Sequence, residues 1–91
     1  MNDSTVSIVS GAASGIGAAC VHRLAARGDV VIGFDLSRSV DQVVRGLGGR
    51  AGVVVDVGSS AAVDAAVAAV IDEFGRVDHV VAAAGIELTA P

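Results

Sequence analysis

SGAASGIG, residues 10–17, lies between a β-branched run and the start of a helical pattern. A turn between a strand and a helix gathers backbone N–H groups and the positive end of the helix dipole, which together can bind an anion. Gly11 would permit the tight turn, Gly15 would let a pyrophosphate approach the backbone, and Gly17 would let the helix pack closely on the strand. The spacing is GxxxGxG and differs from the general GxGxxG fingerprint. An ordinary flexible turn in a glycine-rich sequence is the alternative.

Short apolar runs on both sides of this turn are typical of buried strands. We expect four strands, at residues 5–10, 30–34, 53–55 and 77–84. Helical patterns separate them, so the order of elements is βαβαβαβ. This alternation predicts an α/β, Rossmann-type parallel sheet with helices on both faces and the partial strand order 3-2-1-4. Residues 1–91 would be the N-terminal dinucleotide-binding part of a single domain, truncated before a further expected helix.

Each expected helix has an apolar face and a recognisable end. The first should end at Gly28 and the third at Gly75, since glycine readily adopts the left-handed conformation that ends a helix. Residues 39–42, SVDQ, fit a capping box at the start of the second helix, and Ser59 or Ser60 could cap the third. The expected apolar faces are Ile16, Ala19, Cys20 and Leu24 in the first helix, Val40, Val43, Val44 and Leu47 in the second, and Val63, Val67, Val70, Ile71 and Phe74 in the third.

The composition argues against several classes of protein. The 91 residues are 53% hydrophobic and carry a net charge of −4, and six scattered Arg without any Lys make no basic patch for nucleic acid. The single cysteine, Cys20, allows neither an internal disulfide nor a cysteine-based zinc site. No apolar stretch reaches the roughly 20 residues of a membrane span, and the first residues do not resemble a signal peptide. We expect a cytoplasmic protein without nucleic-acid or membrane partners.

Asp35 follows the second expected strand, 18 residues after Gly17. A carboxylate at this position can accept hydrogen bonds from both hydroxyls of an adenosine ribose and would repel a 2′-phosphate, which favours NAD over NADP. A turn-forming aspartate without a ligand is the alternative. Arg38 would instead favour NADP, because a nearby arginine could hold a 2′-phosphate. Since Asp35 is present, we expect Arg38 to be a solvated surface residue.

Four motifs in order make the sequence similar to the short-chain dehydrogenase/reductase family: SGAASGIG, VVIGFD, VVVDV and EFGRVDHVVAAAG. The first resembles the family's TGxxxGIG, with Ser10 in place of Thr. The resemblance implies that NAD is held by Gly11, Ser14, Gly15, Ile16, Gly17, Asp35, Leu36, Asp56, Val57, Ala83 and Gly85. It implies that Asp56 hydrogen-bonds the adenine amino group and that Val57 flanks the ring. Considered without the resemblance, Asp56 is an acid at a strand end and could equally be a helix-capping turn residue.

The sequence departs from the family's pattern in two places. The family's NNAG corresponds to residues 82–85, AAAG, so both asparagines that brace this strand are alanine. Backbone contacts to the cofactor ribose at Ala83 and Gly85 need no side chain and could persist. The family's catalytic Ser, Tyr and Lys have no recognisable counterpart, since the chain contains neither Tyr nor Lys. His22 and His79 fit surface positions, and no cluster of side chains has the spacing of a metal site.

We therefore expect the NAD-binding portion of an oxidoreductase. The complete protein would transfer hydride between NAD(H) and the hydroxyl or carbonyl group of a small alcohol or ketone, as a homo-oligomer. The 91 residues alone would be inactive. Two alternatives remain, namely a non-catalytic nucleotide-binding module and an α/β structural domain whose glycine turn binds nothing.

Overall fold

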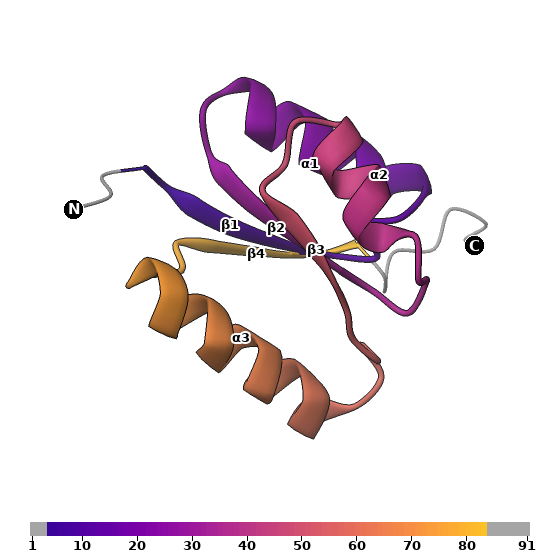
Figure 1. Ribbon diagram of the computed structural model, residues 1–91, viewed down its shortest axis with the longest axis vertical. Coiled ribbons are helices and arrows are strands. Elements are labelled where there is room, and N and C mark those ends of the chain that lie inside the picture. The colour runs from indigo at the N-terminus through magenta and orange to yellow at the C-terminus, as the bar shows by residue number, and fades with distance from the viewer. Residues whose placement is uncertain (1–3, 84–91) are drawn as a thin grey trace, which may run out of the picture.

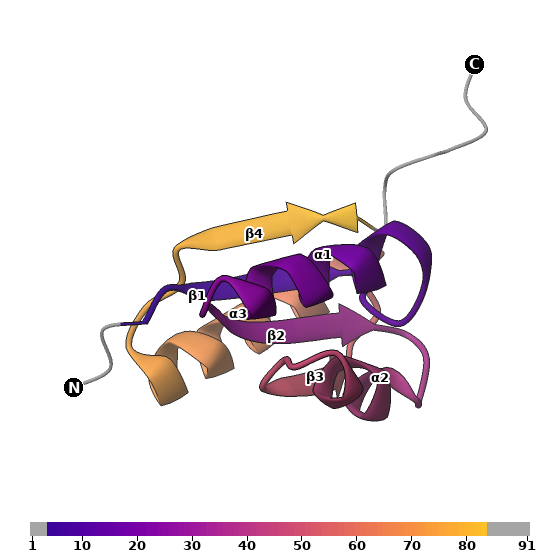
Figure 2. The same ribbon diagram turned by 90° about the horizontal axis from the view of Figure 1, so that it is seen from above.

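The computed structural model describes residues 4–83 and contains a sheet of four parallel strands (Figures 1 and 2). The strands are β1 (Val6–Ser10), β2 (Val30–Asp35), β3 (Ala51–Val54) and β4 (His79–Ala82). Their order is β3-β2-β1-β4, which confirms the predicted order 3-2-1-4. Ile8 is paired with Ile32 on one side and with Val80 on the other. The β1 strand is therefore central, and every loop that follows a strand leaves at the same edge of the sheet.

Helices cover both faces of the sheet, as predicted. α1 (Gly15–Ala26) and α2 (Val40–Gly46) lie on one face, and α3 (Ser60–Phe74) lies on the other (Figure 1). Alternate residues of a strand point to opposite faces, so the sheet separates two hydrophobic cores. The α1/α2 core contains Val9, Ala12, Val21, Val31, Val40, Val44 and Ala83. The α3 core contains Val6, Ile8, Ile32, Phe34, Val55 and Val70.

The buried face of α1 differs from the predicted one. Val21 is fully buried, whereas Ala19 is exposed. Gly17 and Val21 form the centre of the contact, and the predicted residues Ile16, Cys20 and Leu24 flank it half-buried. Gly17 has no side chain and therefore gives no hydrophobic signal, although its position faces the sheet; the hydrophobic Val21 was not included in the predicted face. The predicted end at Gly28 is confirmed by a φ of +98°.

The predicted capping box at the start of α2 is wrong. Ser39 precedes the helix, but its hydroxyl accepts no helical N–H. It pairs instead with the Ser37 hydroxyl at 2.8 Å, and Ser37 also accepts the Ser39 backbone N–H at 3.2 Å. The hydroxyl and the backbone N–H of Ser39, which a capping box requires, are therefore bonded to Ser37. The expected apolar face is present, with Val40 and Val44 fully buried.

Of the two serines predicted to cap α3, Ser59 does so, because its hydroxyl accepts the Ala62 N–H at 3.2 Å. The helix ends as predicted at Gly75, which has a left-handed φ of +80°. Ile71 was expected on the sheet side, yet it is 46% exposed. The other predicted residues Val63, Val67, Val70 and Phe74 do pack in or on the α3 core, together with the small residues Ala62 and Ala66, which were not predicted.

The β3 strand starts two residues before its predicted start at residue 53. It ends at Val54, one residue before the predicted end. Gly52 belongs to it through its pairing with Gly33 of β2, and the backbone of Val40 packs directly on Gly52, where a Cβ would overlap the Val40 carbonyl group. The Gly52 N–H also donates to the Asp41 carboxylate at 2.8 Å, so the start of α2 holds this edge strand. β4 covers residues 79–82, which is shorter than the predicted 77–84, because residues 77, 78 and 83 lie outside the strand. Residues 84–91, including Gly85, lie outside the described residues.

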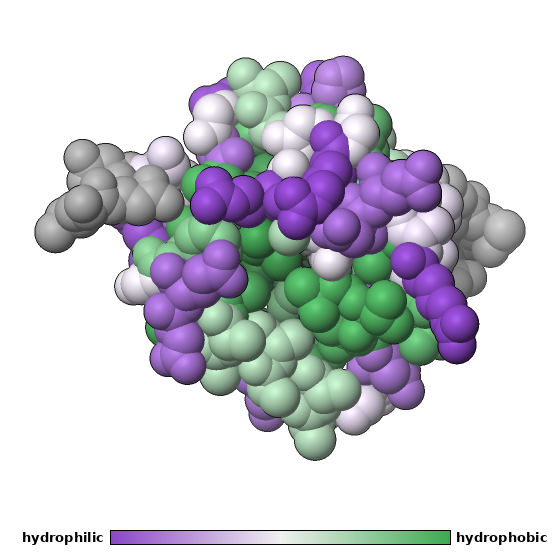
Figure 3. Space-filling model, in the orientation of Figure 1, coloured by the Kyte–Doolittle hydropathy of each residue, from purple (hydrophilic) through white to green (hydrophobic). Residues whose placement is uncertain are grey.

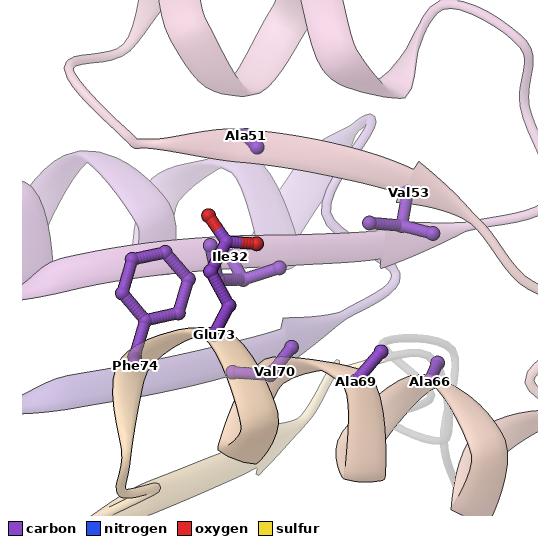
Figure 4. Close-up of a pocket in the computed structure, with 8 residues that line it drawn as sticks. All are labelled: Ile32, Ala51, Val53, Ala66, Ala69, Val70, Glu73 and Phe74. Atoms are coloured by element: carbon purple, nitrogen blue, oxygen red, sulfur yellow. The ribbon is translucent and has the colours of Figure 1, made fainter.

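The β3 edge carries exposed apolar side chains. Val53 and Val54 are exposed, and Figure 3 shows hydrophobic residues gathered on this side between α2 and α3. A hollow of about 120 Å³ opens there between α3 and strands β2 and β3 (Figure 4). Its walls are formed by Ile32, Ala51, Val53, Ala66, Ala69, Val70, Glu73 and Phe74. Within residues 4–83, no helix is long and apolar enough to cross a membrane.

A polar network joins the start of β1 to the residues that precede β2. Arg27 donates two hydrogen bonds of 3.0 Å to Asp29, and the buried Ser7 hydroxyl donates a third at 2.7 Å. The Arg27 guanidinium holds the pKa of Asp29 below its ordinary value, although burial of the carboxyl acts in the other direction. The carboxylate therefore stabilises the folded protein by remaining ionised there.

We predict that Asp29 makes the fold sensitive to acid. Its folded pKa lies below the unfolded value of about 4, so its contribution is present above that value and is lost as the pH falls through the folded pKa. Asp29→Asn should destabilise the fold by about 1–3 kcal/mol at pH 7 and flatten the loss of stability below pH ~4. Urea unfolding at a series of pH values measures both effects, with the exposed Asp72→Asn on α3 as control. An unchanged pH profile in Asp29→Asn would contradict this assignment.

Candidate nucleotide-binding site

The predicted site residues come together where the four parallel strands end. The glycine-rich turn follows β1, Asp35 ends β2, Asp56 and Val57 follow β3, and Ala83 follows β4. In open α/β sheets, ligands bind outside the carboxyl ends of the strands, so this edge is the expected location of a site. Gly85, predicted to contribute backbone contacts, lies outside the described residues.

The glycine-rich turn is held against the end of β2. Gly11 adopts a φ of +71°, which L-residues with a side chain rarely adopt. Its N–H donates to the Phe34 carbonyl at 2.8 Å, and the next amide, that of Ala12, donates to the same carbonyl at 3.2 Å. The expected tight turn at Gly11 is therefore present, and neighbouring strand β2 fixes its direction.

The start of α1 leaves room for an anion. Ser14 precedes the helix in an extended conformation, and its hydroxyl does not cap the helix. Gly15 has a φ of +60°, and a Cβ placed on it would meet no described atom within 4 Å. The first N–H groups of a helix have no acceptor within the helix and carry the positive end of its dipole. This arrangement fits a pyrophosphate, because Gly15 presents bare backbone to an open space.

Gly17 permits close packing of α1, as expected, but at this residue the helix packs on the glycine-rich turn at Gly11 and not on the strand. A Cβ at Gly17 would overlap the carbonyl oxygen of Gly11 and would crowd the Cα of Ala12. The helix thus packs on the turn itself, where packing on the strand was expected. Ile16 is half-buried and packs on the α1/α2 core, so it anchors the start of the helix.

The Asp35 carboxylate binds two backbone amides. One oxygen accepts the Ala13 N–H at 3.0 Å, and the other accepts the Ser37 N–H at 2.9 Å. Sequence reasoning missed both donors. Ser37, two residues after an aspartate, fits the common Asx-turn and could have been found, whereas the Ala13 amide leaves no trace in residue type. Leu36 is 65% exposed beside this carboxylate, and Arg38 is also exposed.

The remaining predicted residues have local partners. Asp56 is exposed, and its carboxylate accepts the Gly58 N–H at 3.0 Å in the turn before α3. Val57 is half-buried against the α3 core. Ala83 is buried in the α1/α2 core. The Ser10 hydroxyl donates to the Val81 carbonyl at 3.3 Å and ties β1 to β4, a bracing bond that the sequence analysis did not predict.

Neither the hollow beside α3 nor the ionisable groups suggest a second centre. The hollow is lined by residues of β2, β3 and α3, and its one ionisable side chain is the Glu73 carboxylate (Figure 4). Among residues 4–83, no group of three His, Cys, Asp or Glu side chains could hold a metal ion. The site at the strand ends therefore offers backbone donors and a carboxylate acceptor, a combination suited to binding a nucleotide.

Comparison with known proteins identifies the family to which this chain belongs. The family model for short chain dehydrogenase matches residues 5–91. The short-chain reductase protein NovJ of Streptomyces niveus is 45% identical over 94% of this chain and 35% of its own length. D-threitol dehydrogenase of Mycolicibacterium smegmatis is 40% identical over 98% of this chain and 36% of its own length.

A solved structure shows the same fold. The 3-oxoacyl-(acyl-carrier protein) reductase of Brucella melitensis, crystallised in complex with NAD, is 32% identical with a TM-score of 0.79, and the match covers 99% of this chain and 37% of that one. The chain thus spans about a third of the length of the relatives that it matches. The family match covers the glycine-rich turn, Asp35 and all four strands, and the chain belongs to the short-chain dehydrogenase family.

Proposed function

We propose that residues 1–91 are the N-terminal dinucleotide-binding part of a single Rossmann-type domain and that they bind NAD. The observation that carries this proposal is the open space at Gly15, at the start of α1, next to a turn that is hydrogen-bonded to Asp35. A relative of the same fold, 32% identical, was crystallised in complex with NAD, which supports the choice of cofactor.

Each part of the dinucleotide has a proposed partner. The first N–H groups of α1, around Ser14, Gly15 and Ile16, bind the pyrophosphate. The Asp35 carboxylate accepts hydrogen bonds from the adenosine ribose. Leu36 and Val57 offer apolar surface to the adenine ring, Asp56 accepts from its amino group, and the backbone at Ala83 and Gly85 contacts the ribose next to the nicotinamide.

The complete protein would be an oxidoreductase that transfers hydride between NAD(H) and an alcohol or ketone. D-threitol dehydrogenase, 40% identical, is named for an alcohol of this kind. Bound NAD supplies the hydride chemistry, while the residues of this chain bind and orient it. Proton transfer would depend on residues other than these 91, which include neither Tyr nor Lys. We further propose a cytoplasmic homo-oligomer, for which the exposed Val53 and Val54 offer apolar contact surface.

One prediction from this proposal concerns cofactor choice. The longest natural chain that contains these residues should bind NAD at least about tenfold more tightly than NADP, because the Asp35 charge opposes a 2′-phosphate. Isothermal titration calorimetry with each cofactor measures the ratio. Arg38→Ala tests whether Arg38 holds a 2′-phosphate, and we expect it to leave NADP affinity unchanged. Equal affinity for both cofactors, or loss of NADP binding in Arg38→Ala, would contradict the role of Asp35.

A second prediction from this proposal concerns Gly15. Gly15→Val should abolish NAD binding, because its side chain would fill the proposed pyrophosphate position. Gly28→Val is the matched control, since Gly28 lies just beyond the other end of α1, also has positive φ and also has no atom within 4 Å of an added Cβ. Both substitutions place a β-branched side chain at positive φ, so both variants carry backbone strain of at least about 1–2 kcal/mol.

Circular dichroism and NAD titration of the two Val variants separate folding from binding. Helical content should be similar in both, while only Gly28→Val should bind NAD. Equal NAD affinity in the two folded variants would show that Gly15 does not face the cofactor.

A further inference from the structure

Three successive amides of the glycine-rich turn are held by the end of β2. The N–H groups of Gly11 and Ala12 donate to the Phe34 carbonyl, and the N–H of Ala13 donates to the Asp35 carboxylate at 3.0 Å. The first two bonds use a main-chain acceptor that any residue at position 34 would supply. The third bond exists only because residue 35 has a side-chain acceptor of the right length.

The other carboxylate oxygen of Asp35 is also engaged. It accepts the Ser37 N–H at 2.9 Å, so the side chain is fixed on both sides. Asp35 is half-buried, and hydrogen bonds to an ionised acceptor are stronger than neutral ones. A carboxylate held in this way is a rigid support for the turn, and Ala13 lies only two residues before Gly15.

We propose that Asp35 is a positioning residue for the pyrophosphate turn, separately from its proposed contact with the ribose. By holding the Ala13 amide, it fixes the chain that leads into Gly15 and the first N–H groups of α1. This inference rests on the proposed function, because it concerns the same site. It adds that diphosphate binding depends on Asp35 even when no ribose hydroxyl is present.

The direction in which diphosphate affinity changes when the Asp35 charge is removed distinguishes a positioning role from simple charge repulsion. A carboxylate near a diphosphate repels it, so removing the charge would by itself strengthen diphosphate binding. Loss of the Ala13 bond acts in the opposite direction, because the turn would no longer be held ready for the ligand. A fall in affinity for a diphosphate without ribose hydroxyls therefore reports positioning, since neither charge nor ribose contact can cause it.

The experiment compares ADP with 2′,3′-dideoxy-ADP as ligands of the longest natural chain that contains these residues. The variants are Asp35→Asn, which keeps one acceptor and places an amide donor against a backbone N–H, and Asp35→Ser, which is too short to reach both amides. Asp64→Asn, an exposed site on α3, is the control for the same change of charge. Calorimetry gives the affinities, and thermal unfolding verifies that each variant is folded.

We expect dideoxy-ADP affinity to fall about tenfold or more in both Asp35 variants and to stay unchanged in Asp64→Asn. Unchanged or increased dideoxy-ADP affinity, with loss of ADP affinity, would overturn the positioning role and leave the ribose role intact. Failure of the wild-type protein to bind either ligand would instead refute the proposed function.

A measurement on the wild-type protein covers the case in which the variants do not fold. The Ala13 amide hydrogen should exchange slowly with solvent before any ligand is added, because the Asp35 carboxylate accepts it. Nuclear magnetic resonance resolves this amide from its neighbours. Exchange at the rate of an unprotected amide would overturn the proposal.

Discussion

Gly17 lies against the carbonyl group of Gly11, and this backbone contact determines where α1 sits. With a Cβ at residue 17 the helix would have to move away from the turn, because the Cβ would overlap the carbonyl oxygen. The first N–H groups of α1 would then no longer meet the ends of the strands. The Phe34 carbonyl holds the other side of the same turn through Gly11 and Ala12. The candidate site is thus built mainly from main-chain contacts, and its proposed ligand specificity depends on the few side chains attached to that backbone, such as Asp35.

The same constraint extends across the α1/α2 face of the sheet. A Cβ at Gly33 would overlap Val44 of α2 and Ala12 of the turn, and one at Gly52 would overlap the Val40 backbone. Glycine at these positions brings α2 close to β2 and β3 and packs the turn against the same surface. The α3 face uses alanine and valine contacts and retains the hollow near Phe74. The tightly packed face is the one that carries the glycine-rich turn, where small displacements would alter hydrogen bonds.

The sequence predicted the fold well and the site only in part. Strand order and the ends at Gly28 and Gly75 follow from periodicity and glycine placement, which are local signals. The start of β3 was wrong and the face of α1 was only partly right, with Ala19 exposed and Val21 missed. Gly52 and Gly17 show no hydrophobicity, although packing places both against other elements. The predicted capping box is absent because Ser37, which lies outside the motif, bonds to the Ser39 hydroxyl and backbone N–H. Side-chain chemistry located Asp35, but its bond to Ala13 could not be predicted, since every residue except proline has the same amide.

Asp35 has the hydrogen-bonding capacity for both roles proposed for it. A carboxylate has about four lone-pair sites, and the Ala13 and Ser37 amides occupy one on each oxygen. One site on each oxygen remains for the two ribose hydroxyls. If Asp35 has both proposed roles, cofactor choice and turn geometry are not independent in this chain. Replacing Asp35 to admit a 2′-phosphate would also free the Ala13 amide, so the change that removes the repulsion would at the same time loosen the turn that both NAD and NADP require.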